Sequence, residues 1–207
     1  MTRSLTPVAL LKAAIATEAI PASAQIYRKG YASWSTPDFE LTAVISGQPG
    51  GQLEWHLFVN DARLGPAMSD FGGMSVSVSS ADGNAIPRNG VDINSEEAVS
   101  FLHNGIGAAK SFVRDRADLA RLLASPTDVQ RGELMAWLPA ANYPARLVKA
   151  LFVARDAELS ELISEIDQKL KAGSILLPGG EELQIRPSAR RWAREYAKRL
   201  GVEVPIG

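Results

Sequence analysis

Two neighbouring stretches of the chain alternate between apolar residues and polar or small ones. The apolar positions are Phe39, Leu41, Ala43 and Ile45 in the first stretch and Leu53, Trp55, Leu57 and Val59 in the second. A period of two predicts strands with one buried face. The glycine-rich segment 47–51 predicts the turn of a hairpin between them. Pairing Ser46 with Gln52 would bring the large apolar residues together on one face.

The remainder of the first half predicts one helix and further strands. Thr6 followed by Pro7 is typical of a helix start, and the helix is expected to cover about residues 7–18. The Ile, Tyr and Trp side chains of residues 25–34 indicate a strand, and alternating Val, Met and Ser in residues 74–79 indicate another.

In the second half the apolar period changes from two to that of a helix. Helices are expected near residues 95–104, 108–124, 144–154, 157–172 and 188–200. Asp156 is expected to cap the fourth of these helices, and Gly201 to end the last. Residues 174–177 and 181–185 predict a small hairpin, whereas residues 132–141 fit either a strand or a helix.

Strands that come early and helices that come late favour an α+β fold over repeated βαβ units. The expected architecture is an N-terminal helix with an antiparallel sheet of three to four strands, followed by a mostly helical C-terminal half with a small hairpin. We expect residues 1–207 to form a single α+β domain. A subdivision into a sheet-rich part, 1–92, and a helix-rich part, 93–207, is the alternative.

Composition limits the chemistry that this chain can perform. It contains no cysteine, and its two histidines are His56 and His103. Disulfides and thiolate metal sites are therefore excluded, and no stretch carries a complete catalytic or metal-binding signature. The sequence predicts no catalytic residue, no metal site and no cofactor, and it favours a protein that is not an enzyme.

The N-terminal segment resembles a secretory signal in part. It has a basic residue, Arg3, and Ala22-Ser23-Ala24 looks like a cleavage site, but Lys12 and Glu18 interrupt the apolar stretch. We therefore expect a retained helix and a cytoplasmic location. No apolar run in the chain approaches the roughly 20 residues that span a bilayer, which predicts no membrane association.

Residues 105–111, Gly-Ile-Gly-Ala-Ala-Lys-Ser, suggest a phosphate-binding loop. Such a loop needs glycine directly before the Lys-Ser pair and again five residues earlier, but these positions hold Ala109 and Asn104. The alternative is a junction between two helices, at which His103 caps the end of the first helix.

One candidate enzyme site consists of Glu18 in a helix, Asp38, and a Glu-x-His pattern on a strand. Glu54 and His56 form that pattern. This layout resembles that of the PD-(D/E)xK nucleases. The resemblance implies that two carboxylates hold a divalent cation while a lysine, here replaced by His56, helps to activate water. The expected register separates Asp38 from Glu54 by about 20 Å, which is too far to share one ion. The alternative is a solvated strand face.

Charge is distributed unevenly along the chain. The formal net charge is −1, yet residues 186–199 hold six basic side chains and one acidic side chain. The helix expected here has an apolar stripe of Ala189, Trp192, Ala193, Tyr196, Ala197 and Leu200. Its basic positions form the candidate site for an anionic partner: Arg186, Arg190, Arg191, Arg194 and Lys198. Trp192 and Tyr196 are expected to face the core, and the acids of residues 156–167 are an internal alternative partner for the arginines.

These features leave three hypotheses about function. The first is a non-catalytic binding or regulatory protein, of accessory or immunity type, that acts through an interface with a protein partner or with a second copy of itself. The second is a nucleic-acid-binding protein that uses the basic C-terminal helix. The third is a metal-dependent enzyme with a degenerate nuclease-like site.

Overall fold

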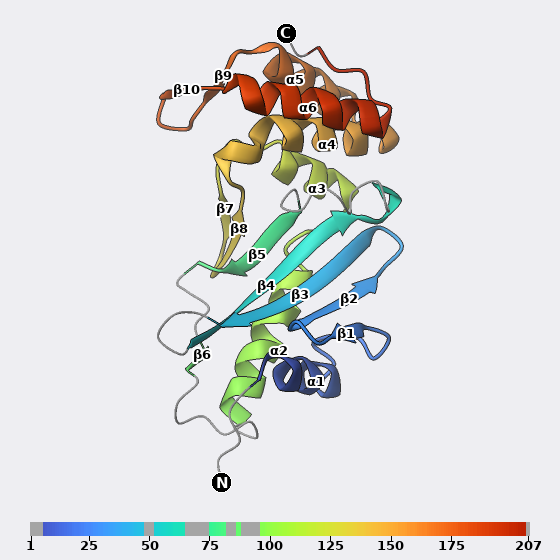
Figure 1. Ribbon diagram of the computed structural model, residues 1–207, viewed down its shortest axis with the longest axis vertical. Coiled ribbons are helices and arrows are strands. Elements are labelled where there is room, and N and C mark those ends of the chain that lie inside the picture. The colour runs from blue at the N-terminus through green and yellow to red at the C-terminus, as the bar shows by residue number, and fades with distance from the viewer. Residues whose placement is uncertain (1–5, 48–51, 65–74, 82–85, 88–95, 206–207) are drawn as a thin grey trace. The chain divides into compact units, whose positions relative to one another are not determined.

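The computed structural model describes residues 6–47, 52–64, 75–81, 86–87 and 96–205 (Figure 1). The chain forms two compact units. The first comprises Met1–Ala62, Ser77–Phe112 and Gln130–Met135, and the second comprises Arg63–Val76, Val113–Val129 and Ala136–Gly207. Within the described residues, no helix is long and apolar enough to cross a membrane.

The larger sheet belongs mainly to the first unit. Its strands are β1 (Gln25–Tyr27), β2 (Tyr31–Ser35), β3 (Phe39–Gly47), β4 (Gln52–Asp61), β5 (Val76–Ser80), β6 (Ile86–Pro87), β7 (Val129–Arg131) and β8 (Leu134–Trp137). The described strands run in the order β1-β2-β3-β4-β5-β8-β7, and β6 pairs with β4. The α+β class is therefore confirmed.

The expected size of the sheet, three to four strands, is wrong. The stretch expected as one strand from 25 to 34 is a hairpin, because Gly30 turns the chain at a positive φ of 89° between β1 and β2. The ambiguous residues 132–141 and the segment before them supply β7 and β8. Short strands of three or four residues carry too little periodicity to be recognised in a sequence.

The predicted hairpin of β3 and β4 exists, but its register differs from the expectation by two residues. Ser46 pairs with Glu54 rather than with Gln52, and Ile45 pairs with Trp55. A shift of two keeps every side chain on its expected face, because side chains alternate with a period of two. The buried face holds Leu41, Ala43, Ile45, Leu53, Trp55, Leu57 and Val59.

Two helices cover the buried face of the sheet (Figure 1). They are α1 (Pro7–Ala16), which contacts β3, and α2 (Glu96–Lys110), which contacts β4. The predicted start of α1 is confirmed, since Thr6 Oγ1 accepts a hydrogen bond of 3.2 Å from the Ala9 amide and Pro7 is the first helical residue.

Helix α2 continues through the glycines at which the sequence predicted a helix end. Gly105 lies in the interior of the helix, and a Cβ atom there would be 2.6 Å from Cζ2 of Trp55. Glycine at this position thus allows the helix to approach the indole closely. The next helix, α3, covers only Arg116–Leu123, because Asp115 caps its start by accepting a hydrogen bond of 2.7 Å from the Asp118 amide.

The second unit is built around one buried helix, α4 (Tyr143–Asp156). It contacts α3, α5 (Ser160–Lys171), α6 (Pro187–Leu200) and the short 3-10 helix η2 (Ala140–Asn142). The predicted hairpin is present as β9 (Ser174–Leu176) and β10 (Glu182–Gln184). The prediction that Asp156 caps the next helix is wrong, because Asp156 is the last residue of α4 and Leu159 precedes α5 without a side-chain cap.

Arg146 is almost completely buried in this unit, with 1% of its surface exposed. Its guanidinium donates hydrogen bonds to the carbonyls of Leu123, Ser125, Leu138 and Pro139, at 3.0–3.4 Å. Burial lowers the pKa of Arg146 to about 10, so the side chain keeps its charge at neutral pH. Arg146 therefore joins α4 to the segments that follow α3 and β8.

Candidate functional site

The basic C-terminal helix is present as predicted. Helix α6 starts at Pro187 and ends at Gly201, whose left-handed φ of 64° closes the last turn. Ala193, Tyr196 and Ala197 are buried, and α6 packs against α4. Burial on one face directs the basic residues of the other face to solvent. Exposed on that side are Arg191, Arg194, Lys198 and Arg199, with Arg186 exposed just before the helix.

Arg190 differs from the other predicted site residues. It is half-buried, and its guanidinium donates a hydrogen bond of 2.9 Å to the carbonyl oxygen of Gly173. Gly173 follows α5 and precedes β9, so Arg190 ties α6 to this connection. Arg190 thus has a structural contact that its sequence position did not reveal.

The expectation that Trp192 faces the core is wrong. Trp192 is 37% exposed, whereas Tyr196 is fully buried. Trp192 precedes the buried Ala193 by one residue, which places it about 100° around the helix from the centre of the contact with α4. The six-residue stripe was therefore too wide to be buried completely.

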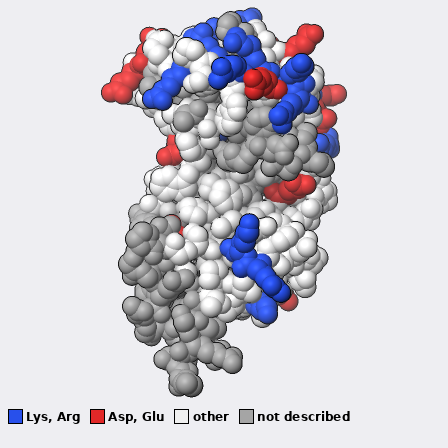
Figure 2. All heavy atoms as spheres, in the orientation of Figure 1, with Lys and Arg blue, Asp and Glu red and all other residues white. Residues whose placement is uncertain are grey.

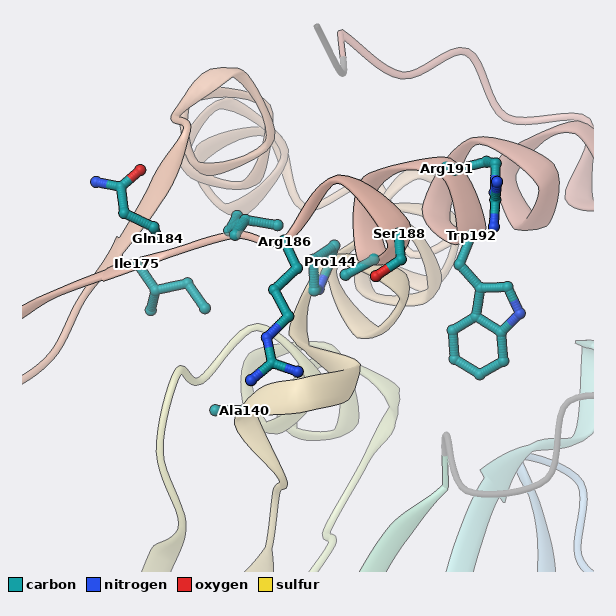
Figure 3. A pocket seen from close by; sticks show the side chains of 10 residues that line it. Ala140, Pro144, Ile175, Gln184, Arg186, Ser188, Arg191 and Trp192 are labelled. Atoms are coloured by element: carbon teal, nitrogen blue, oxygen red, sulfur yellow. The ribbon is translucent and has the colours of Figure 1, made fainter.

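Trp192 lines a cavity of about 540 Å³ in the second unit. The wall is built from η2, the start of α4, the β9–β10 hairpin and the first turns of α6. Its lining residues are Ala140, Pro144, Ile175, Gln184, Ile185, Arg186, Ser188, Ala189, Arg191 and Trp192. In Figure 3 the side chains of Arg186 and Trp192 extend from the α6 segment to the same side, and Arg186 points toward Ala140. Sequence reasoning found the two arginines of this cavity but missed Trp192, Gln184 and Ser188.

Two of the acids suggested as internal partners, Asp156 and Glu165, form ion pairs with cations outside α6. Asp156 pairs with Arg63 and Arg116, and Glu165 pairs with Lys169 at 2.6 Å. The hydrogen bond from Arg116 is the largest of the effects that lower the pKa of Asp156. Figure 2 shows Lys and Arg side chains gathered over the second unit, with acidic side chains beside them. These ion pairs of Asp156 and Glu165 are made with Arg63, Arg116 and Lys169, none of which belongs to α6.

Glu54 and His56 lie two residues apart on the half-exposed face of β4, and the structure brings Ser77 of β5 to them. His56 Nδ1 is 3.3 Å from Ser77 Oγ, and His56 Nε2 is 3.8 Å from Glu54 Oε2. The sequence did not suggest this contact, because Ser77 lies 21 residues away. A Ser-His-acid triad requires hydrogen bonds on both sides of the imidazole, and 3.8 Å is longer than a hydrogen bond.

Asp38 does not join this group. It lies next to Phe39, which pairs with Asp61 at the far end of the hairpin, and Glu54 pairs with Ser46. Asp38 therefore lies eight positions along the chain from Ser46, the partner of Glu54, a distance of about 26 Å at 3.3 Å per residue. In the described part of the chain, no three His, Asp or Glu side chains are placed to hold a metal ion together.

The other two sequence candidates lie on α2. Gly105 and Gly107 are both helical, so the backbone of residues 105–110 forms helical hydrogen bonds instead of wrapping a phosphate. His103 is an exposed residue inside this helix, and the prediction that it caps a helix end is wrong. Continuation of the helix through Gly105 accounts for both differences.

Comparison of the chain with protein-family models, with curated protein sequences and with solved structures finds no match. The arrangement of its own side chains is therefore the basis for a functional proposal.

Proposed function

We propose that this chain is a non-catalytic binding protein whose helix α6 contacts nucleic acid through its basic face. The observation that carries the proposal is the exposure of Arg191, Arg194 and Lys198 on one side of a helix held by burial of its other side. Their spacing of three and four residues corresponds to about 4.5 and 6 Å along the helix axis. Long basic side chains at such spacing can neutralise neighbouring phosphates of one strand.

The rigidity of α6 supports this proposal. The helix is closed at its C-terminus by Gly201, and the buried Tyr196 anchors its inner face. A fixed row of cations loses less conformational freedom on binding than a flexible basic tail does. The electrostatic attraction to phosphates is independent of sequence, so we expect affinity without strong sequence preference.

The test compares two triple variants with the same change of charge. Arg191→Glu, Arg194→Glu and Lys198→Glu together reverse the α6 face, while Lys12→Glu, Arg28→Glu and Lys29→Glu reverse three exposed cations of the first unit. Binding of a labelled DNA duplex is measured by fluorescence anisotropy over a range of salt concentrations. We expect the α6 variant to lose roughly 100-fold or more in affinity, with a shallower salt dependence.

The control variant is expected to bind within about three-fold of the unmodified protein, because its charge change lies elsewhere. Equal losses in both variants would show that only net charge matters, and that result would contradict a site on α6. Arg190 is left unchanged in both variants because its hydrogen bond to Gly173 is structural.

A protein interface is the second candidate, and exposed apolar side chains of the second unit favour it. Leu176 of β9 is 70% exposed and Trp137 of β8 is 38% exposed. Apolar groups of this size contribute to the centre of protein interfaces. Two results together would favour this candidate over nucleic acid. One protein should co-purify with the chain in a stoichiometric amount and be lost in Leu176→Ser, and the chain should not be retained on a DNA column.

A further inference from the structure

We propose that the cavity beside α6 receives an unpaired nucleobase, which stacks on Trp192 while Arg186 and Arg191 hold the adjoining phosphates. This inference rests on the proposed nucleic-acid binding and makes it specific: the preferred ligand is a single strand. The site combines three independent features, namely an exposed indole, two guanidinium groups and a cavity that all three line.

The size of the cavity fits a small aromatic ligand. Pockets for such ligands measure about 300–1,000 Å³, and this one measures about 540 Å³. Its walls include the apolar side chains of Pro144, Ile175 and Ala189. Apolar walls with a few polar groups are typical of sites that enclose a planar ring.

Trp192 provides the surface on which a base can stack. Its indole extends from α6 to the same side as the Arg186 side chain (Figure 3), and both residues line the cavity. Stacking between a base and an aromatic side chain tolerates every sequence, because each base has a π face. The indole is also the best aromatic partner for a cation, so a neighbouring guanidinium is compatible with it.

The polar groups of the cavity suit a nucleotide better than an acidic peptide. Arg186 and Arg191 supply positive charge for phosphates, and the Gln184 amide can both donate and accept hydrogen bonds at a base edge. A carboxylate side chain would satisfy the arginines but would leave the indole and the apolar wall uncovered. Duplex bases are paired and stacked inside the helix, so only an unpaired base can enter.

The experiment measures the affinity of the full chain for an oligothymidylate of about 20 nucleotides and for a duplex of similar length, each by fluorescence anisotropy. Trp192→Ala is expected to weaken binding of the oligothymidylate by about 5- to 100-fold, the range typical for loss of one stacked base. Binding of the duplex is expected to change by less than about three-fold, since the charges of α6 remain.

Trp137→Ala is the matched control, because Trp137 is 38% exposed, belongs to the same unit and does not line the cavity. It is expected to bind both probes like the unmodified protein. Trp192→Leu keeps an apolar side chain without a π face, and we expect it to bind the oligothymidylate as weakly as Trp192→Ala does. Thermal unfolding of each variant verifies that the fold is retained.

Tryptophan fluorescence gives a second readout that does not depend on affinity. Stacking of thymine on the indole quenches its emission. Unlabelled oligothymidylate is therefore expected to quench the tryptophan emission of the unmodified protein and of Trp137→Phe, but not that of Trp192→Phe. Trp34 and Trp55 are buried and contribute a constant background. Equal quenching by poly-L-glutamate would overturn the proposal in favour of an acidic protein segment.

The outcomes separate the two proposals. If the protein binds neither oligothymidylate nor duplex, the proposed function fails and the cavity proposal fails with it. If it binds both probes through α6 and Trp192→Ala or Trp192→Leu binds oligothymidylate normally, only the cavity proposal is overturned. A loss confined to the single strand in both Trp192 variants supports it.

Discussion

Gly105 of α2 lies directly against the indole of Trp55 of β4. A Cβ atom at position 105 would be 2.6 Å from Cζ2 and 2.9 Å from Cε2 of that ring, closer than van der Waals contact permits. Trp55 is 1% exposed and belongs to the apolar face of the central hairpin. The absence of a side chain at residue 105 thus sets how closely α2 packs on the sheet.

Gly105→Ala is therefore expected to destabilise the protein by about 1–3 kcal/mol, because overpacking moves a buried indole or the helix. Gly107→Ala is a matched control in the same helix, since a Cβ atom there meets no atom within 4 Å. That substitution is expected to stabilise the protein by about 0.5–1 kcal/mol through helix propensity. Urea unfolding measures both values, and stabilisation by both substitutions would contradict the packing argument.

Arg146 is predicted to be required for the fold of the second unit. Arg146→Met retains the length of the side chain but leaves four carbonyl groups without the donor that they share. We expect a loss of about 3 kcal/mol or more in the free energy of unfolding. Arg155→Met, at an exposed position of the same helix, is expected to cost less than about 1 kcal/mol. Similar small losses for both variants would show that the buried hydrogen bonds are unimportant.

The parts of the fold that could be predicted are those with strong local patterns. Helix α1 has its capping threonine and first-turn proline, α4 has a clear apolar stripe, and α6 ends at a glycine, so the sequence indicated all three. The failures involve partners distant in sequence. Nothing near Gly105 indicates that Trp55 packs on it, and the acceptors of Arg146 lie 7–23 residues away. The predicted register of β3 and β4 was wrong for a related reason. The period of two shows which side chains share a face of the sheet, but the turn determines which residues of the two strands pair.

Arg190 and Arg194 are predicted to have different roles although both are basic residues of α6. Arg190→Gln removes the guanidinium group that donates a hydrogen bond to the Gly173 carbonyl, and we expect this substitution to cost about 1 kcal/mol of stability. Arg194→Gln changes an exposed residue, so its effect on stability should stay within about 0.5 kcal/mol. Affinity for a DNA duplex should fall more in Arg194→Gln. Comparison of unfolding and anisotropy for the two variants tests this division, and the reverse ranking would contradict it.

The candidate site could be predicted only in part for the same physical reason. A run of arginines at helical spacing is visible in a sequence, and its exposure follows once the opposite face is buried. The apolar stripe of α6 is wider than the surface that its neighbours cover, so the packing of those neighbours determines which edge of the stripe stays exposed. Trp192 lies at the exposed edge. Gln184 reaches the same cavity from β10, and no pattern in the chain connects it to α6.

Asp156 is predicted to make stability depend on pH. Its carboxylate accepts hydrogen bonds from Arg116 and Arg63, and these hold the pKa of Asp156 below its ordinary value, with the larger effect from Arg116. A carboxyl group with a lowered folded pKa stabilises the protein above its unfolded pKa, and this contribution is lost as the pH falls through the folded pKa. Asp156→Asn should therefore cost about 1 kcal/mol at pH 7, a modest value because solvent screens the half-exposed carboxylate.

The difference between Asp156→Asn and the unmodified protein is expected to shrink as the pH falls below the ordinary pKa of an aspartate, because protonation of the native carboxylate removes its charge. Glu181→Gln removes a carboxylate at an exposed position in the turn of the β9–β10 hairpin and serves as the control. Urea unfolding at several pH values between about 3 and 7 measures the effect. A cost for Asp156→Asn that stays constant over this range would mean that Arg116, which is almost completely buried, depends on the shape of the Asp156 side chain and not on its charge.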